Sequence, residues 1–149
     1  MTMSCHSKVV FTIPGPAQAK QRPRVNRNTG RIYTPGATHK YEKLVKESYG
    51  DNPCFEDQFI SVKILFKFSV PKSYSKKKRS EALEGIIRPT KADIDNYIKS
   101  VLDGLNGVAW RDDRYIYAIT AEKIFAEKSE VIVEISNKKK ERLIWINLK

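Results

Sequence analysis

The aspartates of this chain are concentrated in one short stretch. Five of the seven lie within 21 residues, in a protein whose formal net charge is +11: Asp93, Asp95, Asp103, Asp112 and Asp113. Carboxylates that lie close together raise one another's energy unless a positive charge lies among them. Magnesium prefers oxygen ligands and retains several waters, so two or three carboxylates and a substrate phosphate are sufficient to hold it. The cluster therefore indicates a divalent cation bound beside a polyanion, which is the chemistry of a metal-dependent nuclease.

A helix must position the first of these acids. Apolar residues recur there at spacings of four, three and four, which predicts an amphipathic helix: Ile94, Ile98, Val101 and Leu105. Thr90–Asp93 fits a capping box in front of this helix, and Asn106-Gly107 marks its end. The part of the helix that follows Asp95 would span about 15 Å. Asp113 therefore reaches the acids at the helix start only if residues 106–113 double back, a span that eight extended residues can cover.

Each charged residue of this stretch also has a purely structural interpretation. Asp93 and Asp95 at a helix N-terminus complement the helix dipole, each by a few tenths of a kcal/mol. Lys99 either forms an ion pair with Asp95, worth about 0.2–0.5 kcal/mol, or stabilises charge on a phosphate beside the metal. Its spacing alone favours the ion pair. Asp112-Asp113 suits a polar turn as well as a metal site, and Asp103 is expected on the solvated side of the helix, outside the site.

The composition restricts the classes of partner. Lys and Arg number 28 against 17 acids, which favours a nucleic acid, an anionic membrane or an acidic protein. No apolar run approaches the roughly 18 residues of a spanning helix, and the first residues lack the apolar core of a signal peptide. Cys5 and Cys54 lack metal-type spacing, and His6 and His39 are isolated, which argues against a zinc or histidine-metal nuclease. We expect reduced thiols, a cytoplasmic location and no membrane partner.

Two basic segments are candidates for contacts with DNA phosphates, which are salt-sensitive and blind to sequence. The first is a long, polar connection at residues 17–36, which is expected to lack regular structure and to be functional. The second follows Pro71. Their cations are Lys20, Arg22, Arg24, Arg27 and Arg31 in the first segment and Lys76, Lys77, Lys78 and Arg79 in the second. Each run is also compatible with a solvated surface. Tyr33 is compatible with stacking on an exposed base and equally with a role in the core or in a turn.

The remaining pattern predicts a single α+β domain over residues 1–149, with two main helices and a mixed, mostly antiparallel sheet. Strands are predicted at 9–13, 59–70, 115–125 and 130–135, and further helices at 37–49 and 75–83. Residues 126–129 are too few for a parallel crossover, so the last two strands are expected to form an antiparallel hairpin. Residues 143–148 suit a last strand or a dimer contact.

At this point the chain resembles the RusA family of Holliday junction resolvases. The resemblance rests on Asp93-Ile-Asp95-Asn96-Tyr-Ile-Lys99, Leu102-Asp-Gly-Leu-Asn-Gly107 and Trp110-Arg-Asp112-Asp113, and in the N-terminal part on Ile13-Pro-Gly-Pro, Lys20-Gln-Arg-Pro-Arg24 and Tyr33-Thr-Pro35. It runs from about residue 9 to residue 125. Residues 137–149 form an extension that it does not cover.

The resemblance implies a small homodimer that binds four-way DNA junctions and cuts paired strands with Mg²⁺, for which Mn²⁺ can substitute. It assigns metal binding to Asp93, Asp95 and Asp113 and makes Lys99 an essential residue, which reverses the preference for an ion pair. Asp112 becomes a possible accessory ligand. Asn96 is expected to support the metal ligands through a hydrogen bond to a carboxylate or a bound water. No small-molecule cofactor is implied.

Three alternatives to a junction resolvase stay open. The chain could be a DNA-binding module without catalysis, whose acids serve only as caps and turns. It could be a nuclease for other branched or flap DNA. A sugar-nucleotide transferase with an Asp-x-Asp motif is disfavoured, because no Gly-rich phosphate loop or nucleotide-binding βαβ pattern accompanies the motif. An EF-hand is excluded, since Tyr97 and Ile98 occupy positions that need a ligand and a glycine.

Overall fold

The computed structural model describes residues 7–138, which fold around one four-stranded sheet. Its strands lie in the order β1-β6-β4-β5, with bounds Lys8–Pro14 (β1), Glu130–Ser136 (β6), Ile60–Ser69 (β4) and Ile116–Ala126 (β5). β6 pairs antiparallel with both β1 and β4, whereas β4 and β5 are parallel. The expected α+β fold with a mixed, mostly antiparallel sheet is therefore confirmed. The expectation for residues 143–148 lies outside the described residues.

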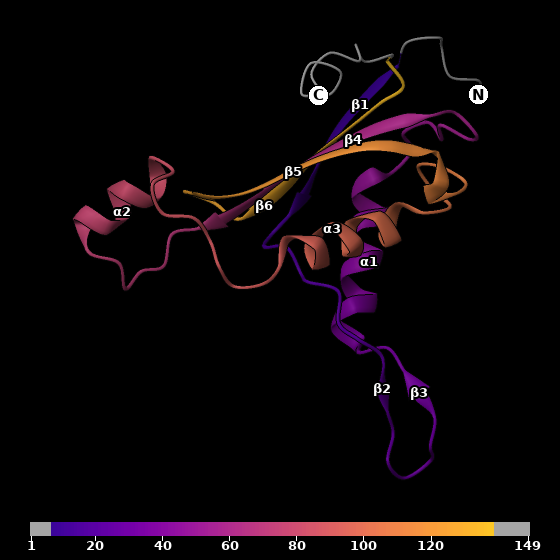
Figure 1. The fold of residues 1–149 in the computed structure, drawn as a ribbon, viewed down its shortest axis with the longest axis horizontal. Coiled ribbons are helices and arrows are strands. Elements are labelled where there is room, and N and C mark those ends of the chain that lie inside the picture. The colour runs from indigo at the N-terminus through magenta and orange to yellow at the C-terminus, as the bar shows by residue number, and fades with distance from the viewer. Residues whose placement is uncertain (1–6, 139–149) are drawn as a thin grey trace, which may run out of the picture.

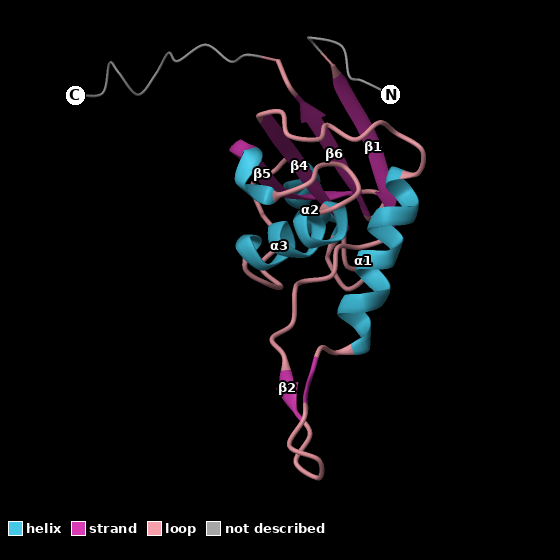
Figure 2. Cartoon of the chain, turned by 90° about the vertical axis from the view of Figure 1, so that its right-hand side faces the viewer, coloured by secondary structure: helices cyan, strands magenta, loops and turns pink. Residues whose placement is uncertain are grey.

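Two helices cover one face of this sheet (Figure 2). They are α1 (Gly36–Tyr49) and α3 (Ile94–Leu105). Buried and exposed residues alternate along β1 as expected for a strand with one covered face. Val9, Phe11 and Ile13 are buried, and the residues between them are exposed. Apolar side chains from the inner face of the sheet and from both helices form a single core. Because α3 packs on this core, the acids at its start are held on a rigid element.

Close contact between α1 and α3 depends on a glycine. A Cβ atom added to Gly104 of α3 would lie 2.8 Å from Cβ and 2.9 Å from Cγ1 of the fully buried Val45 on α1. Nonbonded carbon atoms prefer separations of about 3.5–4.0 Å. The two helices can therefore approach this closely only because position 104 has no side chain.

We predict that Gly104→Ala destabilises the fold, because the added methyl group overpacks the contact between the helices. The expected loss is about 1–3 kcal/mol in the free energy of unfolding, measured by urea denaturation. Gly36→Ala is the matched control, since a Cβ atom at Gly36 meets nothing within 4 Å. An unchanged midpoint for Gly104→Ala would contradict the close packing of α1 on α3.

The expected hairpin of the last two strands is wrong. β4 lies between β5 and β6, so these two strands are antiparallel but not neighbours. Two strand spacings amount to about 10 Å, which the short connection from Ala126 to Glu130 can bridge. The connection passes the end of β4, where Ser129 Oγ accepts a hydrogen bond from the backbone N–H of Ser69 at 2.8 Å. A short loop limits the distance between two strands but does not require them to pair.

The expected capping box is also wrong. Asp93, and not Thr90, occupies the N-cap position of α3, and its side chain makes no capping hydrogen bond. Residues 88–92 have no helical turn in front of α3. The Asp93 carboxylate therefore does not cap the N-terminus of α3 and is available to bind a ligand.

The first basic segment contains a small hairpin that the sequence pattern did not predict. β2 (Arg24–Val25) and β3 (Ile32–Tyr33) pair antiparallel, and they project away from the sheet and the helices (Figure 1). The tip is closed by hydrogen bonds from Asn26 N–H to the Arg31 carbonyl at 2.8 Å and from Gly30 N–H to the Asn26 carbonyl at 2.7 Å. Every residue from 22 to 33 is exposed, so the hairpin has almost no apolar contact with the rest of the protein.

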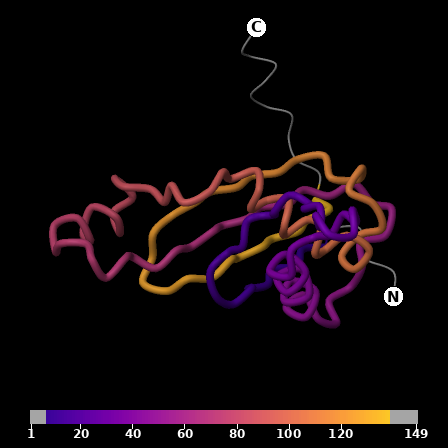
Figure 3. The backbone as a smooth tube through the Cα atoms, turned by 90° about the horizontal axis from the view of Figure 1, so that it is seen from below, coloured from indigo at the N-terminus to yellow at the C-terminus, as the bar shows by residue number. Residues whose placement is uncertain are grey.

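The second basic segment forms the expected short helix, α2 (Lys76–Leu83), with Ser75 as its N-cap. Ser75 Oγ accepts a hydrogen bond from the backbone N–H of Lys78 at 3.2 Å. Figure 3 shows α2 at one end of the long strands β4 and β5 and α1 toward the other end. The two basic segments therefore lie on different projections of the molecule. None of the helices in residues 7–138 is long and apolar enough to span a membrane.

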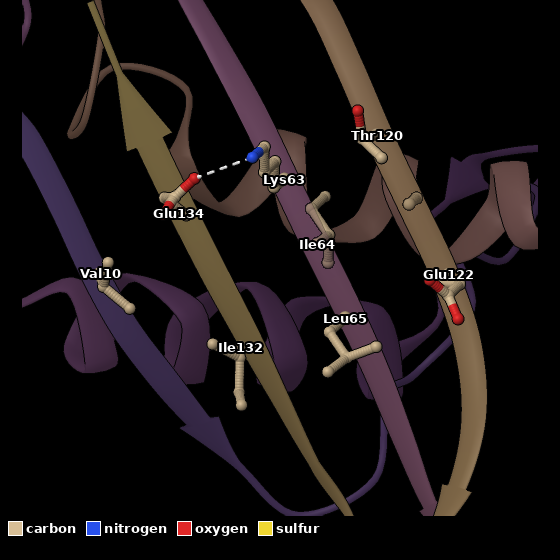
Figure 4. A pocket seen from close by; sticks show the side chains of 9 residues that line it. Val10, Lys63, Ile64, Leu65, Thr120, Glu122, Ile132 and Glu134 are labelled. Atoms are coloured by element: carbon tan, nitrogen blue, oxygen red, sulfur yellow. Dashed lines mark ion pairs between the residues drawn. The ribbon is translucent and has the colours of Figure 1, made fainter.

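The sheet face opposite the helices carries a shallow hollow of about 280 Å³ (Figure 4). Val10, Leu65 and Ile132 line it, and Lys63 pairs with Glu134 across two neighbouring strands at 3.6 Å. The aspartates at positions 93, 95 and 113 do not line this hollow. It is therefore separate from the candidate site described below.

Candidate metal and nucleic-acid site

The start of α3 presents two of the predicted ligands and the predicted lysine. Asp95 lies in the first helical turn, and Lys99 follows it by one turn. The side chains of Asp93, Asp95 and Lys99 are exposed. Asp95 Oδ1 accepts a hydrogen bond from the backbone N–H of Asn96 at 2.9 Å. None of the ion pairs formed within residues 7–138 includes Asp93, Asp95 or Lys99, so the ion pair between Asp95 and Lys99 is not formed.

Two contacts from distant parts of the chain hold the start of α3. Lys123 of β5 donates from Nζ to the carbonyl oxygen of Ala92 at 2.8 Å, one residue before Asp93. The backbone N–H of Lys20 donates to the carbonyl oxygen of Asn96 at 2.9 Å. Asn96 thus links α3 to the connection between β1 and β2 through its main chain. The supporting role expected of the Asn96 side chain stays a prediction.

Lys123 was not among the residues that the sequence pattern singled out. It lies 30 residues after Asp93, and only the parallel pairing of β4 and β5 brings it to the start of α3. The available signal is a lysine on a strand face that otherwise carries Ile119, Ala121 and Phe125. A charge on such a face implies a specific polar partner, which here is the Ala92 carbonyl.

Asp113 lies at the other end of α3. Asn106 forms a bridge with Trp110, and Gly107 N–H donates to the Trp110 carbonyl at 2.8 Å, so the chain turns directly after the helix. Asp113 then begins a short 3-10 helix (Asp113–Tyr115) that leads into β5. Strand β5, and not residues 106–113, makes the return toward the helix start. The 12 residues of α3 separate Asp113 from Asp93 by about 18 Å.

The two acids beside α3's far end have local partners. Asp113 Oδ1 accepts a hydrogen bond from Nε1 of Trp110 at 2.6 Å, and the Trp110 side chain is fully buried. Asp112 Oδ1 caps the 3-10 helix by accepting the backbone N–H of Arg114 at 3.0 Å. The buried indole therefore orients Asp113, whereas Asp112 has the turn role that its sequence context also allowed.

A divalent metal fits only part of the expected ligand set. In residues 7–138, no group of three or more His, Cys, Asp or Glu side chains lies close enough to hold a metal ion, so one chain does not assemble Asp93, Asp95 and Asp113. Asp93 and Asp95 provide two exposed carboxylates that form no ion pair with the described part of the chain. Magnesium is commonly held by one or two carboxylates together with substrate phosphates. The pair at the start of α3 therefore fits this kind of binding.

Lys20 has a different environment from the one expected of a DNA contact. Its Nζ lies 2.6 Å from a Glu42 carboxylate oxygen and 2.9 Å from an Asp103 oxygen. Burial of the ammonium lowers the pKa of Lys20, but hydrogen bonds to Glu42 and Asp103 outweigh burial and raise its pKa above the ordinary value. Lys20 therefore fastens the connection between β1 and β2 to α1 and α3. Asp103, expected to be solvated, is half-buried in this ion pair.

The other cations predicted to contact DNA differ in whether they already contact a side chain of the protein. Arg79 pairs with Glu127 at 2.6 Å, and Lys78 Nζ lies 4.1 Å from the centre of the Tyr74 ring. Within the described part of the chain, the remaining predicted cations form no ion pair: Arg22, Arg24, Arg27, Arg31, Lys76 and Lys77. Four of these six lie on or beside the exposed hairpin, which makes it the more cationic of the two projections.

Comparison with known proteins decides the family. A family profile described as Endodeoxyribonuclease RusA matches residues 14–136, most of the chain. The chain belongs to the RusA family. The chain is also similar to a protein of Bacillus subtilis (strain 168) described as "Uncharacterized protein YqaN", with 33% identity over 135 residues that cover 85% of this chain and 94% of that protein.

Membership of the RusA family makes the chain an endodeoxyribonuclease of the Holliday junction resolvase type. RusA resolvases generally depend on a divalent metal. The matched region contains the whole of α3, the hairpin, α2 and Asp113. The resemblance noted from short motifs thus extends through β6, whose last residue is Ser136.

Proposed function

We propose that this RusA-family chain is a Mg²⁺-dependent, structure-selective nuclease that resolves four-way DNA junctions by paired, symmetric nicks in recombination and repair. The observation that carries the proposal is the pair of exposed carboxylates at the start of α3, Asp93 and Asp95, followed by Lys99, which forms no ion pair within residues 7–138. This position lies between the two cationic projections, α2 and the hairpin (Figure 1). A phosphodiester held by the projections would be presented to the carboxylates.

The proposed chemistry is hydrolysis of a phosphodiester by water. Asp93 and Asp95 would hold the cation, which would lower the pKa of a bound water and orient the scissile phosphate. Lys99 lies one turn further along α3 and stabilises the negative charge that develops on the phosphate oxygens. Lys123 and the Lys20 backbone act as positioning groups, because they hold the residues on either side of Asp93 and Asp95.

A homodimer accounts for the position of Asp113. Ligands of one Mg²⁺ ion lie about 2 Å from it, so Asp113 and Asp93 of one chain cannot share an ion when a helix length separates them. In a two-fold dimer, the partner's Asp113 can complete the site formed by Asp93 and Asp95. A four-way junction has approximate two-fold symmetry, so two such composite sites would make symmetric cuts.

The experiment that tests the proposed function compares a labelled four-way junction with a linear duplex of the same sequence, with and without Mg²⁺. We expect paired nicks at symmetric positions on the junction, only with the metal present. Equal cutting of the duplex would instead indicate a nuclease without selectivity for structure. Cutting of a flap or a three-way junction in preference to the four-way junction would indicate another branched substrate.

A further inference from the structure

A second cavity, of about 400 Å³, lies next to the proposed catalytic residues. Its walls come from the ends of β4 and β5, from Tyr74 before α2, and from residues 89–91, which lead into α3. Pro16, from the connection that also carries Lys20, lies at its edge. The cavity thus joins the base of the α2 projection to the segment immediately before Asp93.

Three aromatic residues are among those that line the cavity. Phe68, Tyr74 and Phe125 line it, and the rings of Tyr74 and Phe125 meet edge to face with centres 5.9 Å apart. The Phe68 ring also contacts the ring of Tyr97 on α3, with centres 5.4 Å apart. Contacts between rings therefore fix these walls, and the cavity is largely formed before any ligand enters.

The surroundings of the cavity are cationic. Lys91 lines it, Lys78 Nζ lies over the Tyr74 ring at 4.1 Å, and Lys76 and Lys77 are exposed on the adjoining helix. Thr90 and Ser69 add hydroxyl groups to the lining. An apolar, aromatic slot with hydroxyl groups and a cationic border suits a ligand that combines a flat ring with a phosphate. A nucleotide within a DNA strand has this combination.

We propose that this cavity receives one unstacked base of the DNA strand that is cut, next to the scissile phosphate. The proposal rests on the proposed function, because the strand is placed by the site at Asp93 and Asp95. Ligand pockets of drug-sized molecules measure about 300–1,000 Å³, so a cavity of about 400 Å³ is large enough to hold one base. Bases stack on aromatic side chains whatever their sequence. A base at the centre of a branched junction is unstacked at less cost than one within a duplex.

The test is a scan with abasic sites. Wild-type protein without divalent metal binds junctions in which one nucleotide at a time, near the cut position, is replaced by an abasic residue. Removal of the base that occupies the cavity should weaken binding by about 5- to 100-fold, and removal of the other bases should have little effect. The same scan with Tyr74→Ala should lose this position-specific effect, while Tyr74→Phe should retain it because the ring is still present.

Two further variants keep the result interpretable. Thr90→Trp places a large ring at an exposed edge of the cavity and should also remove the position-specific effect, even if Tyr74→Ala unfolds. Tyr117→Ala changes an exposed tyrosine that does not line the cavity, and should leave the scan unchanged. A scan in which no position responds, or in which Tyr74→Ala and Thr90→Trp leave the response intact, overturns the base-binding cavity. Wild-type protein that neither binds nor cuts the junction would overturn the proposed function itself.

Discussion

Asp95→Asn is expected to abolish junction cleavage while junction binding is retained or becomes tighter. The carboxylate is a proposed ligand of the metal, and an amide is a far poorer ligand for Mg²⁺. Even the outer partners of metal ligands change activity by about 10- to 100-fold, so we expect the cleavage rate to fall by at least about a hundredfold. Binding should not suffer, because the substitution removes negative charge near a phosphate.

The measurement is single-turnover cleavage of a labelled junction together with its affinity in the absence of metal. Asp51→Asn is the matched control, since it makes the same change in an exposed aspartate that lies outside α3. The control should cut at close to the wild-type rate. If Asp95→Asn cuts as fast as the wild type, the site assignment is wrong. If the wild type itself binds junctions without cutting them, the rival DNA-binding module without catalysis is favoured.

Mixed dimers of one Asp95→Asn chain and one Asp113→Asn chain distinguish a site shared between two chains from a site within one chain. Each variant alone should be inactive. In a mixed dimer with a composite site, one site carries both substitutions and the other carries neither, so one of the two nicks should return. If Asp93, Asp95 and Asp113 of a single chain acted together, both sites of the mixed dimer would be damaged and no nick would return.

Replacement of three hairpin arginines by alanine is expected to weaken junction binding strongly and to make it less dependent on salt. Arg24, Arg27 and Arg31 are exposed and form no ion pair within the described part of the chain. Each contact between a cation and a phosphate of duplex DNA contributes about 0.9 to the slope of log affinity against log salt concentration. The proposed homodimer would lose six such contacts, three from each chain, so the magnitude of this slope should fall by about five.

The measurement is a titration of binding at several salt concentrations without divalent metal. The control removes the same charge elsewhere, with Lys8, Lys43 and Lys46 replaced by alanine on β1 and α1, where the side chains are also exposed. Only a small change in slope is expected for the control. An equal change for both triple variants would mean that net charge, and not the hairpin, determines binding.

Local patterns in the sequence predicted most of the elements. The apolar spacing from Ile94 to Leu105 corresponds to α3, and Ser75 and Gly85 bracket α2 as expected. The hairpin at β2 and β3 was not predicted because its strands are only two residues long and lie outside the core. The pairing of the last two strands was wrong because strand order depends on contacts between distant segments, which a short connection does not determine.

The amino-acid sequence alone was sufficient to predict metal-dependent chemistry on a phosphodiester and to place it at the start of α3. An Asp-x-Asp motif at a helix start, a lysine one turn later and a strongly basic chain are local or compositional features, so they are visible without a fold. Only the tertiary structure decided which charges lie together. Strand β5, and not the segment before it, carries the chain back along α3, which leaves Asp113 a helix length from Asp93 and brings Lys123 to the Ala92 carbonyl. Lys20 likewise pairs with Glu42 and Asp103 because the fold brings the connection between β1 and β2 next to both α1 and α3.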